Sequence, residues 1–584
     1  MPWTSVVPVS SCCRRLGAVT ASLLVALSPA WGLGASAAEL LELRLDGLQI
    51  PIRLDQLEVW SRRGPAAAPD LDVWLGLLEA GSRDDLRALL NAPLLRDRSF
   101  GRQLLDSWAG SQMLAAVGDL LTTADGRSTT PLLPVTLREL LARRREVTAL
   151  ELLRALPPRQ LVLELDSLLA LADGWRRQLR RQGDALAQLR RLPLPLRTDP
   201  QPGAPLPAAG APPASRPAPS LPPGMALTPR RQRLSVPHRP EPLPLEIWLP
   251  ASSRPAAGAR PSAAASPATA PASAAAAAPA GDAGPAGSSR PWLLLMPGLG
   301  GTADQLGWLA ADLAGRGWAV VALQHPGSDA EAVRAALVGQ RPPPGAETLA
   351  VRLADVEAVL QARRTGRLAV PGEGVVLMGH SLGGLTALLA AGLVPEPGLE
   401  HRCRQALRRL PISNPSRLLQ CQLPATGLPA PRSRPAELRG AVVYNGFGSL
   451  LWPSRGLAPL PLPVLLVGGG RDLVTPPIDE QLGLFLPAGH RRSRLVLVDG
   501  GSHFSPVRVS GQEEVLFRLG GDLVGDDPLR VQELLAALTS DFLLSLERPG
   551  RLPAQFRRQQ GVSAWVLDRA SARRWSRAIG ARGD

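Results

Sequence analysis

Apolar, strand-like runs alternate with helical patterns along the second half of the chain. The apolar runs are 292–296, 318–323, 375–378, 441–444, 464–467 and 495–498. Helical periodicity covers 302–315, 347–362 and 382–393, and a closing helix is expected at Asp527, an N-cap residue followed by Pro528. Strands that are apolar throughout are buried on both faces, so the pattern predicts a largely parallel sheet with helices on both sides.

Residues 39–165 follow a different pattern, with one alternating run at 40–46 and helical periodicity after it. The apolar positions begin with Leu54, and a further helix is expected to open at Ser82 with a capping box that reaches Asp85. These positions predict the core of a small, mainly helical domain. The block contains no histidine and no cysteine, so we expect no chemistry in it.

The composition changes after this block. Residues 166–192 have the pattern of a longer, arginine-rich helix. Such a helix can contact an anionic membrane surface as a peripheral partner, but more commonly its basic face is solvated. Residues 193–226 are rich in proline and predict a linker.

The sheet-forming domain is expected to begin at residue 227. A pair of strands, at 233–236 and 245–249, precedes a tract at 251–290 made mostly of Ala, Pro, Ser and Gly. This tract cannot build a core, and it predicts a disordered insertion inside a domain that extends over 227–546. The remaining residues, 547–584, are expected to form a C-terminal tail.

The beginning of the chain combines charge, an apolar run and small residues. Arg14 and Arg15 precede the apolar segment 16–33, which is followed by Ala-Ser-Ala-Ala at 35–38. This order is typical of an export signal, so we expect residues 1–38 to be removed and the protein to be periplasmic or secreted. An uncleaved N-terminal membrane anchor is the alternative, since the run is barely long enough to span a bilayer.

Two of the four cysteines, Cys12 and Cys13, lie in this signal. Cys403 and Cys421 remain, and an even pair in an oxidising compartment favours a disulfide. It would close a loop of about 17 residues and stabilise the fold by roughly 3 kcal/mol. Two buried thiols are the alternative. We expect no metal site, because only His401 lies near either cysteine.

The charge of the chain does not indicate a nucleic-acid partner. The formal net charge is +15, and all 65 basic residues are arginine. Acidic residues are interspersed among them, and the composition does not indicate a basic patch with aromatic residues beside it. We therefore expect an ordinary solvated basic surface and no bound nucleic acid.

The stretch GHSLG around Ser381 follows a predicted strand and precedes a predicted helix. This is the nucleophile-elbow pattern, in which a strained turn exposes a serine oxygen above the sheet at a helix N-terminus. A helix N-cap serine is the alternative, since the pattern is common in a glycine-rich chain, but its position between strand and helix favours the nucleophile. The residues of the elbow are Gly379, His380, Ser381, Leu382 and Gly383.

A nucleophilic serine needs a histidine base and an orienting acid, which in this fold follow it in the order Ser, acid, His. Of the six histidines, only His503 directly follows the last predicted strand. Asp472 follows the strand before it and is the expected acid; Asp499 is the second choice, and Asp479 lies further from the strand end. Ser381, Asp472 and His503 are therefore the predicted catalytic triad.

An oxyanion hole needs backbone N–H groups that point at the developing negative charge, each worth about 3 kcal/mol. One is expected from Leu382, directly after the nucleophile. The other is expected from Leu299 in the glycine-rich loop 297–301, which follows the first apolar strand. A dinucleotide-binding loop is the alternative for this segment, but it lacks the last glycine of that motif.

Taken together, these motifs resemble those of the α/β-hydrolases, and more narrowly a largely cyanobacterial group of exported hydrolases. The hydrolase domain of that group is similar to platelet-activating-factor acetylhydrolases and dienelactone hydrolases, and its N-terminal domain has no known function. The matching motifs are PGLGG (297–301), LQHPGSDA (323–330), GHSLGG (379–384), GGGRDLVTP (468–476) and GGSHFSP (500–506).

The resemblance implies an α/β-hydrolase fold over about 228–545, after an N-terminal domain at 39–165. It also implies that the cysteine pair lies in a cap region, about 395–437, over the site. The first motif departs from the family, because Pro297 stands where a histidine usually precedes the glycine.

The expected activity is hydrolysis of a carboxylic ester of a lipid or a short acyl chain, through an acyl-enzyme, with no cofactor and no metal. Two alternatives stay open. The first is a hydrolase that has lost its activity and binds a ligand or partner. The second is an enzyme that cleaves thioesters or amides with the same triad.

Overall fold

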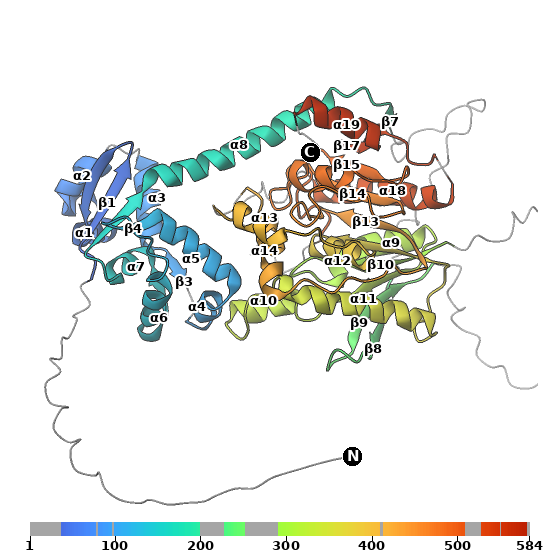
Figure 1. Ribbon diagram of the computed structural model, residues 1–584, viewed down its shortest axis with the longest axis horizontal. Helices are drawn as coiled ribbons and strands as arrows, with labels where there is room; N and C mark the ends of the chain where they lie inside the picture. The colour runs from blue at the N-terminus through green and yellow to red at the C-terminus, as the bar shows by residue number, and fades with distance from the viewer. Residues whose placement is uncertain are drawn as a thin grey trace, which may run out of the picture.

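The computed structural model describes residues 37–76, 80–95, 98–198, 227–250, 290–408, 411, 413–508, 527–548 and 550–580. An N-terminal part and a larger sheet domain are joined by the long helix α8 (Leu165–Arg190), as Figure 1 shows. Nearly all of the predicted export signal, most of the predicted linker and nearly all of the predicted insertion lie outside the described residues.

The N-terminal part is mainly helical, as predicted, and its helices pack around a small sheet of order β2-β1-β6-β4. The sheet strands are β1 (Leu40–Leu45), β2 (Leu48–Arg53), β4 (Leu121–Thr123) and β6 (Gln160–Glu164), and a separate pair is β3 (Pro93–Leu95) with β5 (Val147–Thr148). The helices are α1 (Leu54–Arg63), η1 (Pro65–Ala67), α2 (Pro69–Leu75), α3 (Ala80–Asn91), α4 (Arg98–Leu105), α5 (Trp108–Leu120), α6 (Leu133–Arg143) and α7 (Ala149–Ala155). Trp60 is fully buried in its core. Helix α3 begins at Ala80, so the predicted start at Ser82 is wrong by two residues.

The larger domain is built on a sheet of order β7-β16-β17-β15-β14-β13-β12-β10-β11-β9-β8. Its strands are β7 (Leu196–Thr198), β8 (Arg230–Leu234), β9 (Leu243–Trp248), β10 (Trp292–Met296), β11 (Val320–Leu323), β12 (Val375–His380), β13 (Leu438–Tyr444), β14 (Val464–Gly469), β15 (Arg494–Val498), β16 (Gln555–Gln559) and β17 (Val562–Leu567). The run from β11 to β15 is parallel, which confirms the sheet predicted from the apolar pattern. At both sides of this run the pairing becomes antiparallel.

Helices cover both faces of this sheet. The helices of the sheet domain are η3 (Ala303–Leu306), α9 (Gly307–Gly315), α10 (Ala330–Leu337), η4 (Ala346–Thr348), α11 (Leu349–Arg364), α12 (Leu382–Ala390), α13 (Leu399–Ala406), α14 (Ser416–Thr426), η5 (Ile478–Leu482), α15 (Gly483–Phe485), α18 (Pro528–Glu547) and α19 (Arg569–Ala578). Helices α9 and α18 share one apolar core with the sheet, and α11, α12 and α19 share the core on the other face. Helix α18 begins where predicted, with Asp527 accepting a hydrogen bond from the amide of Arg530.

The C-terminal residues do not form the tail that we expected at 547–584. Instead β16 and β17 form a hairpin that extends the sheet beyond β15, and α19 packs on the same core. Three residues of the predicted linker, Leu196–Thr198, also join the sheet as β7, beside β16. The physical reason is that β17 is buried throughout and covers the edge of β15, which would otherwise expose unpaired backbone groups.

Helix α8, the predicted basic helix, is packed along one side against the sheet domain. Arg181 donates to Asp479 at 2.8 Å, and Arg190 donates to Asp499 at 3.0 Å. The Trp575 indole donates to the carbonyl of Ala185 at 2.8 Å. Part of the basic face is therefore used to bind carboxylates of the protein itself.

The predicted cap region contains α13 and α14, and the disulfide Cys403–Cys421 joins the two helices, as the cysteine count predicted. Helix α14 also contacts α5 of the N-terminal part. Within the described residues, no helix is both long enough and apolar enough to cross a membrane.

Candidate active site

Ser381 occupies a strained turn between β12 and α12. Its φ is +52°, a conformation that a residue with a side chain rarely adopts, and its amide donates to the Tyr444 carbonyl at 2.9 Å. The flanking glycines are required by close packing. A Cβ on Gly379 would lie 2.3 Å from the Gly383 carbonyl, and a Cβ on Gly383 would lie 2.4 Å from the Met296 carbonyl. The turn therefore has the geometry of the predicted nucleophile elbow.

His503 and Asp472 lie together in the loops that follow β15 and β14, which are neighbours in the sheet. His503 Nδ1 and Asp472 Oδ2 are 3.0 Å apart, and both residues are buried. Because the carboxylate accepts, Nδ1 carries the proton, and Nε2 is the nitrogen left for a nucleophile. The two residues that we predicted as base and acid are thus hydrogen-bonded to each other.

Several donors hold the Asp472 carboxylate in addition to His503. The amides of Val474 and Thr475 donate to Oδ1 at 2.8 and 2.7 Å, and the Thr475 hydroxyl donates to Oδ2 at 2.6 Å. Asn445 Nδ2 donates to the same Oδ2 at 2.5 Å. Burial alone raises the pKa of Asp472, but the attraction of His503 and these hydrogen bonds lower the pKa below its ordinary value. The carboxylate is therefore ionised at neutral pH.

His380 holds the loop that carries His503. Its Nε2 donates to the His503 carbonyl at 2.8 Å, and the two rings lie 4.9 Å apart. Burial and the neighbouring His503 lower the pKa of His380 to about 3, so this ring is neutral. The sequence placed His380 only as an elbow residue. Its adjacency to Ser381 was the one available signal, and no local pattern indicated its partner 123 positions later.

The Ser381 hydroxyl and the His503 ring form no hydrogen bond in the described part of the chain. Ser381 is 8% exposed and sits directly beside His380, whose ring contacts His503. Bonds between nucleophile and base are often long in ligand-free enzymes and shorten when the substrate binds. The structure thus places the three predicted triad residues close together. His503 and Asp472 are hydrogen-bonded, and the bond between Ser381 and His503 is not formed.

The two predicted oxyanion donors belong to segments next to Ser381. Leu382 is the first residue of α12, and Leu299 follows Gly298, whose Cβ, if present, would be 3.2 Å from the Ser381 Cβ. Neither the Leu382 nor the Leu299 amide donates to another of the described residues. Both N–H groups are therefore available to a substrate oxygen, and the helix N-terminus favours negative charge there.

The other acids and histidines considered in the sequence have different partners. Asp479 binds Gln178 and Arg181 of α8, and Asp499 binds Arg190. His238 and His325 both bind Asp355 on α11, at 2.8 and 2.7 Å. None of these side chains is bonded to His503 among the described residues, so the choice of Asp472 is the one that the geometry favours.

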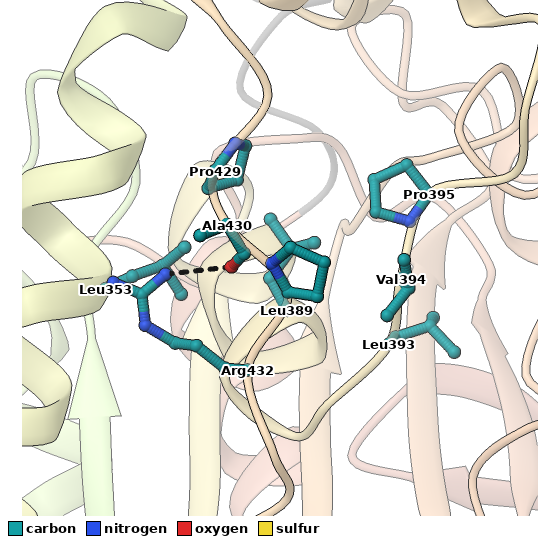
Figure 2. A pocket seen from close by; sticks show the side chains of 9 residues that line it. Leu353, Leu389, Leu393, Val394, Pro395, Pro429, Ala430 and Arg432 are labelled. Carbon is teal, nitrogen blue, oxygen red and sulfur yellow. Dashed lines mark hydrogen bonds between the residues drawn. The ribbon is translucent and has the colours of Figure 1, made fainter.

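Figure 2 shows the lining of a small apolar pocket. It includes Leu389, near the end of α12 that lies away from Ser381. The pocket is lined by Leu353, Leu389, Leu393, Val394, Pro395, Pro429, Ala430, Pro431 and Arg432. The Arg432 guanidinium donates to the Ala430 carbonyl at 3.3 Å and closes one side. Because α12 has nine residues, at about 1.5 Å of rise each, the pocket is too far from Ser381 to hold the reacting bond. The described residues include no group of acidic, histidine or cysteine side chains that is arranged for a metal ion.

Two family models match the chain. Residues 293–516 match the alpha/beta hydrolase family, and residues 37–164 match an alpha/beta hydrolase family of unknown function, DUF1400. No curated protein matches the sequence. The first match contains Ser381, Asp472 and His503. The protein therefore has an α/β-hydrolase domain, which is the predicted fold class, and the match indicates a hydrolase. The narrower resemblance to platelet-activating-factor acetylhydrolases and dienelactone hydrolases stays a prediction.

Proposed function

We propose that this protein is a serine hydrolase that cleaves carboxylic esters through Ser381, His503 and Asp472. The observation that carries the proposal is the hydrogen bond of 3.0 Å between His503 and Asp472, at the same sheet edge as the strained turn of Ser381. A base oriented by an acid, beside a serine hydroxyl on a strained turn, is the arrangement that activates a hydroxyl for attack on an acyl carbon.

In the proposed reaction, Ser381 Oγ attacks the ester carbonyl while His503 Nε2 takes its proton. The amides of Leu382 and Leu299 stabilise the negative oxygen of the tetrahedral intermediate. When the intermediate collapses, the protonated His503 gives its proton to the departing alcohol, and an acyl-enzyme remains. Water, deprotonated by His503, then attacks the acyl-enzyme; the protonated His503 returns its proton to Ser381 Oγ as that oxygen leaves, and the carboxylic acid is released. Asp472 stays ionised throughout, in agreement with its lowered pKa.

The test is Ser381→Ala in purified full-length mature protein, assayed with short and long p-nitrophenyl esters, lysophospholipids, thioesters and amides. We expect kcat to fall by roughly 10⁴-fold or more with an unchanged thermal midpoint, because only the nucleophile is removed. Ser61→Ala is the matched control, since Ser61 is a buried serine of the N-terminal part whose hydroxyl donates to the Glu58 carbonyl.

Three results would count against all or part of the proposal. Retained activity in the Ser381→Ala protein would show that the nucleophile lies elsewhere. Failure of a fluorophosphonate probe to label Ser381 in the wild type, with no turnover of any substrate, would instead favour a binding protein. A strong preference for thioesters or amides would keep the triad and change the substrate class.

We also propose that the protein is exported and acts in an oxidising compartment. The disulfide Cys403–Cys421 supports this, since disulfides persist outside the cytosol. We expect the mass of the protein recovered from its native host to correspond to a chain that begins close to Glu39. A mass that includes residues 1–38 would favour the anchored alternative.

A further inference from the structure

A buried guanidinium lies behind the candidate oxyanion hole. Arg352 of α11 is 1% exposed and donates to three acceptors on three different segments. Nη2 donates to the Pro297 carbonyl, Nη1 donates to the Ser328 hydroxyl at 2.8 Å, and Nε donates to the Thr386 hydroxyl at 3.3 Å. Pro297 opens the loop of Leu299, Ser328 lies in the loop after β11, and Thr386 belongs to the nucleophile helix.

Each of these acceptors is itself connected to the backbone that presents an oxyanion donor. The Ser328 carbonyl accepts from the Gly300 amide at 2.8 Å, next to Leu299. The Thr386 hydroxyl donates to the Leu382 carbonyl at 2.7 Å. Arg352 is thus connected to both candidate donors: to the Leu299 loop through the Pro297 carbonyl, and to Leu382 through the Thr386 hydroxyl.

A buried carboxylate attracts the charge of Arg352, although its hydrogen bonds go to other side chains. Asp355, one turn further along α11, is fully buried and accepts from both Nε and Nη2 of Arg239 at 2.6 Å. The same carboxylate binds His238 and His325. Burial lowers the pKa of Arg352 to about 9, so the side chain still carries its charge at neutral pH. This arrangement keeps a cation under the loop at a position where burial alone would disfavour it.

We propose that Arg352 is a positioning residue that sets the Leu299 and Leu382 amides at the distance a tetrahedral oxyanion requires. This inference rests on the proposed hydrolase function. One cation with three fixed donors holds the loop after β10 against the nucleophile helix, and Pro297 takes part through its carbonyl. The carbonyl of this residue is available whatever its side chain, so the loop is anchored although proline has replaced the usual histidine.

The experiment compares Arg352→Met and Arg352→Lys with wild type by two inhibition constants. One is for a trifluoromethyl ketone that carries the preferred acyl chain and forms an oxyanion adduct with the serine. The other is for the carboxylic acid product, which forms none. We expect Arg352→Met to lose about tenfold or more in both kcat and ketone affinity, with product affinity unchanged, because displaced donors affect only the oxyanion. Arg352→Lys should bind the ketone more weakly than wild type but more tightly than Arg352→Met.

Arg363→Met is the matched control. Arg363 lies on the same helix and donates to the Gly372 carbonyl at 3.1 Å, away from the site, so its removal should leave both constants unchanged. Thr386→Val and Ser328→Ala remove single contacts of Arg352, and each should weaken the ketone several-fold even if Arg352→Met does not fold.

The outcomes separate the two proposals. A wild type that neither hydrolyses esters through Ser381 nor binds the ketone overturns the proposed function and this inference together. An active wild type whose Arg352→Met variant keeps its ketone affinity overturns only the role of Arg352. Equal losses of ketone and product affinity would also overturn it, since they indicate a general disturbance of the site.

Discussion

Gly383 shows how the position of one backbone atom limits the residue type near the nucleophile. A Cβ at this position would lie 2.4 Å from the Met296 carbonyl and 2.6 Å from the Pro297 carbonyl. Both carbonyls belong to the end of β10 and the loop that contains Leu299. The glycine therefore allows the nucleophile helix to approach the candidate oxyanion loop. Close packing thus requires glycine at position 383, in addition to the tight turn.

We predict that Gly383→Ala destabilises the protein by about 2 kcal/mol or more, because the methyl group overlaps backbone atoms that cannot rotate away. Catalysis should fall about tenfold or more, because relief of the overlap moves the oxyanion loop. Urea unfolding and ester turnover measure the two effects. Gly483→Ala is the control: Gly483 is exposed, begins α15 and has open space around its Cβ, so this change should be neutral or slightly stabilising. An unaltered Gly383→Ala enzyme would contradict the close approach.

At the scale of elements, the C-terminal hairpin completes the sheet beside the strand that leads to His503. Strands β15 and β17 pair antiparallel over Leu495–Val498, and β16 continues into β17 through a two-residue turn. Gln560 and Gly561 in that turn both have positive φ, +48° and +85°, as a tight hairpin requires. The glycine-containing turn directly before the apolar run of β17 was the signal in the sequence that should have identified this hairpin.

Deletion of residues 549–584 is therefore expected to abolish the native fold of the sheet domain and not merely to shorten it. The deletion leaves β15 as an edge strand and exposes the apolar surface that β17 and α19 cover. We expect aggregation by size-exclusion chromatography and loss of turnover, since the His503 loop begins at the end of β15. Arg573→Ala, a change at an exposed position of α19, should behave like wild type. A monomeric, active deletion protein would show that the hairpin is dispensable.

At the scale of the whole molecule, acid should act on stability through two buried histidines. Burial is the main cause that lowers the pKa of both His325 and His380 to about 3, compared with 6.5 without burial. Between these values the unfolded chain binds protons that the folded protein does not. Stability is thus fully present above pH 6.5 and falls as the pH decreases toward 3.

We predict that the free energy of unfolding falls by on the order of 3 kcal/mol per pH unit between pH 6 and 4, as two protons are taken up. His325→Asn keeps a donor for Asp355 but cannot be protonated, so the slope should decrease by about one proton. His401→Asn, a change of an exposed histidine on α13, should leave the slope as in wild type. Denaturant unfolding at several pH values gives the slope. A slope that His325→Asn does not change would mean that this histidine is already protonated in the folded protein.

The sequence by itself determined the parallel strands of the sheet and their order along the chain, because the periods of strands and helices are local properties of the chain. The apolar runs identified β10 to β15, and Asp527 with Pro528 identified the start of α18. It also indicated that Ser381, Asp472 and His503 come directly after strands, since parallel strands bring their carboxyl ends to one edge. Even the disulfide followed from a count of cysteines and an expected compartment.

Only the tertiary structure decided which side chains support that site, because their partners are far away in sequence. His380 binds the loop of His503, Asn445 binds Asp472, and Arg352 binds Pro297, contacts that no local period reveals. The same holds for the edge of the sheet. Strand β7 pairs with β16, which lies hundreds of positions later, and β17 pairs with β15 across the predicted end of the domain. Long-range hydrogen bonds and shared burial depend on how elements pack, and packing is a property of the folded chain as a whole.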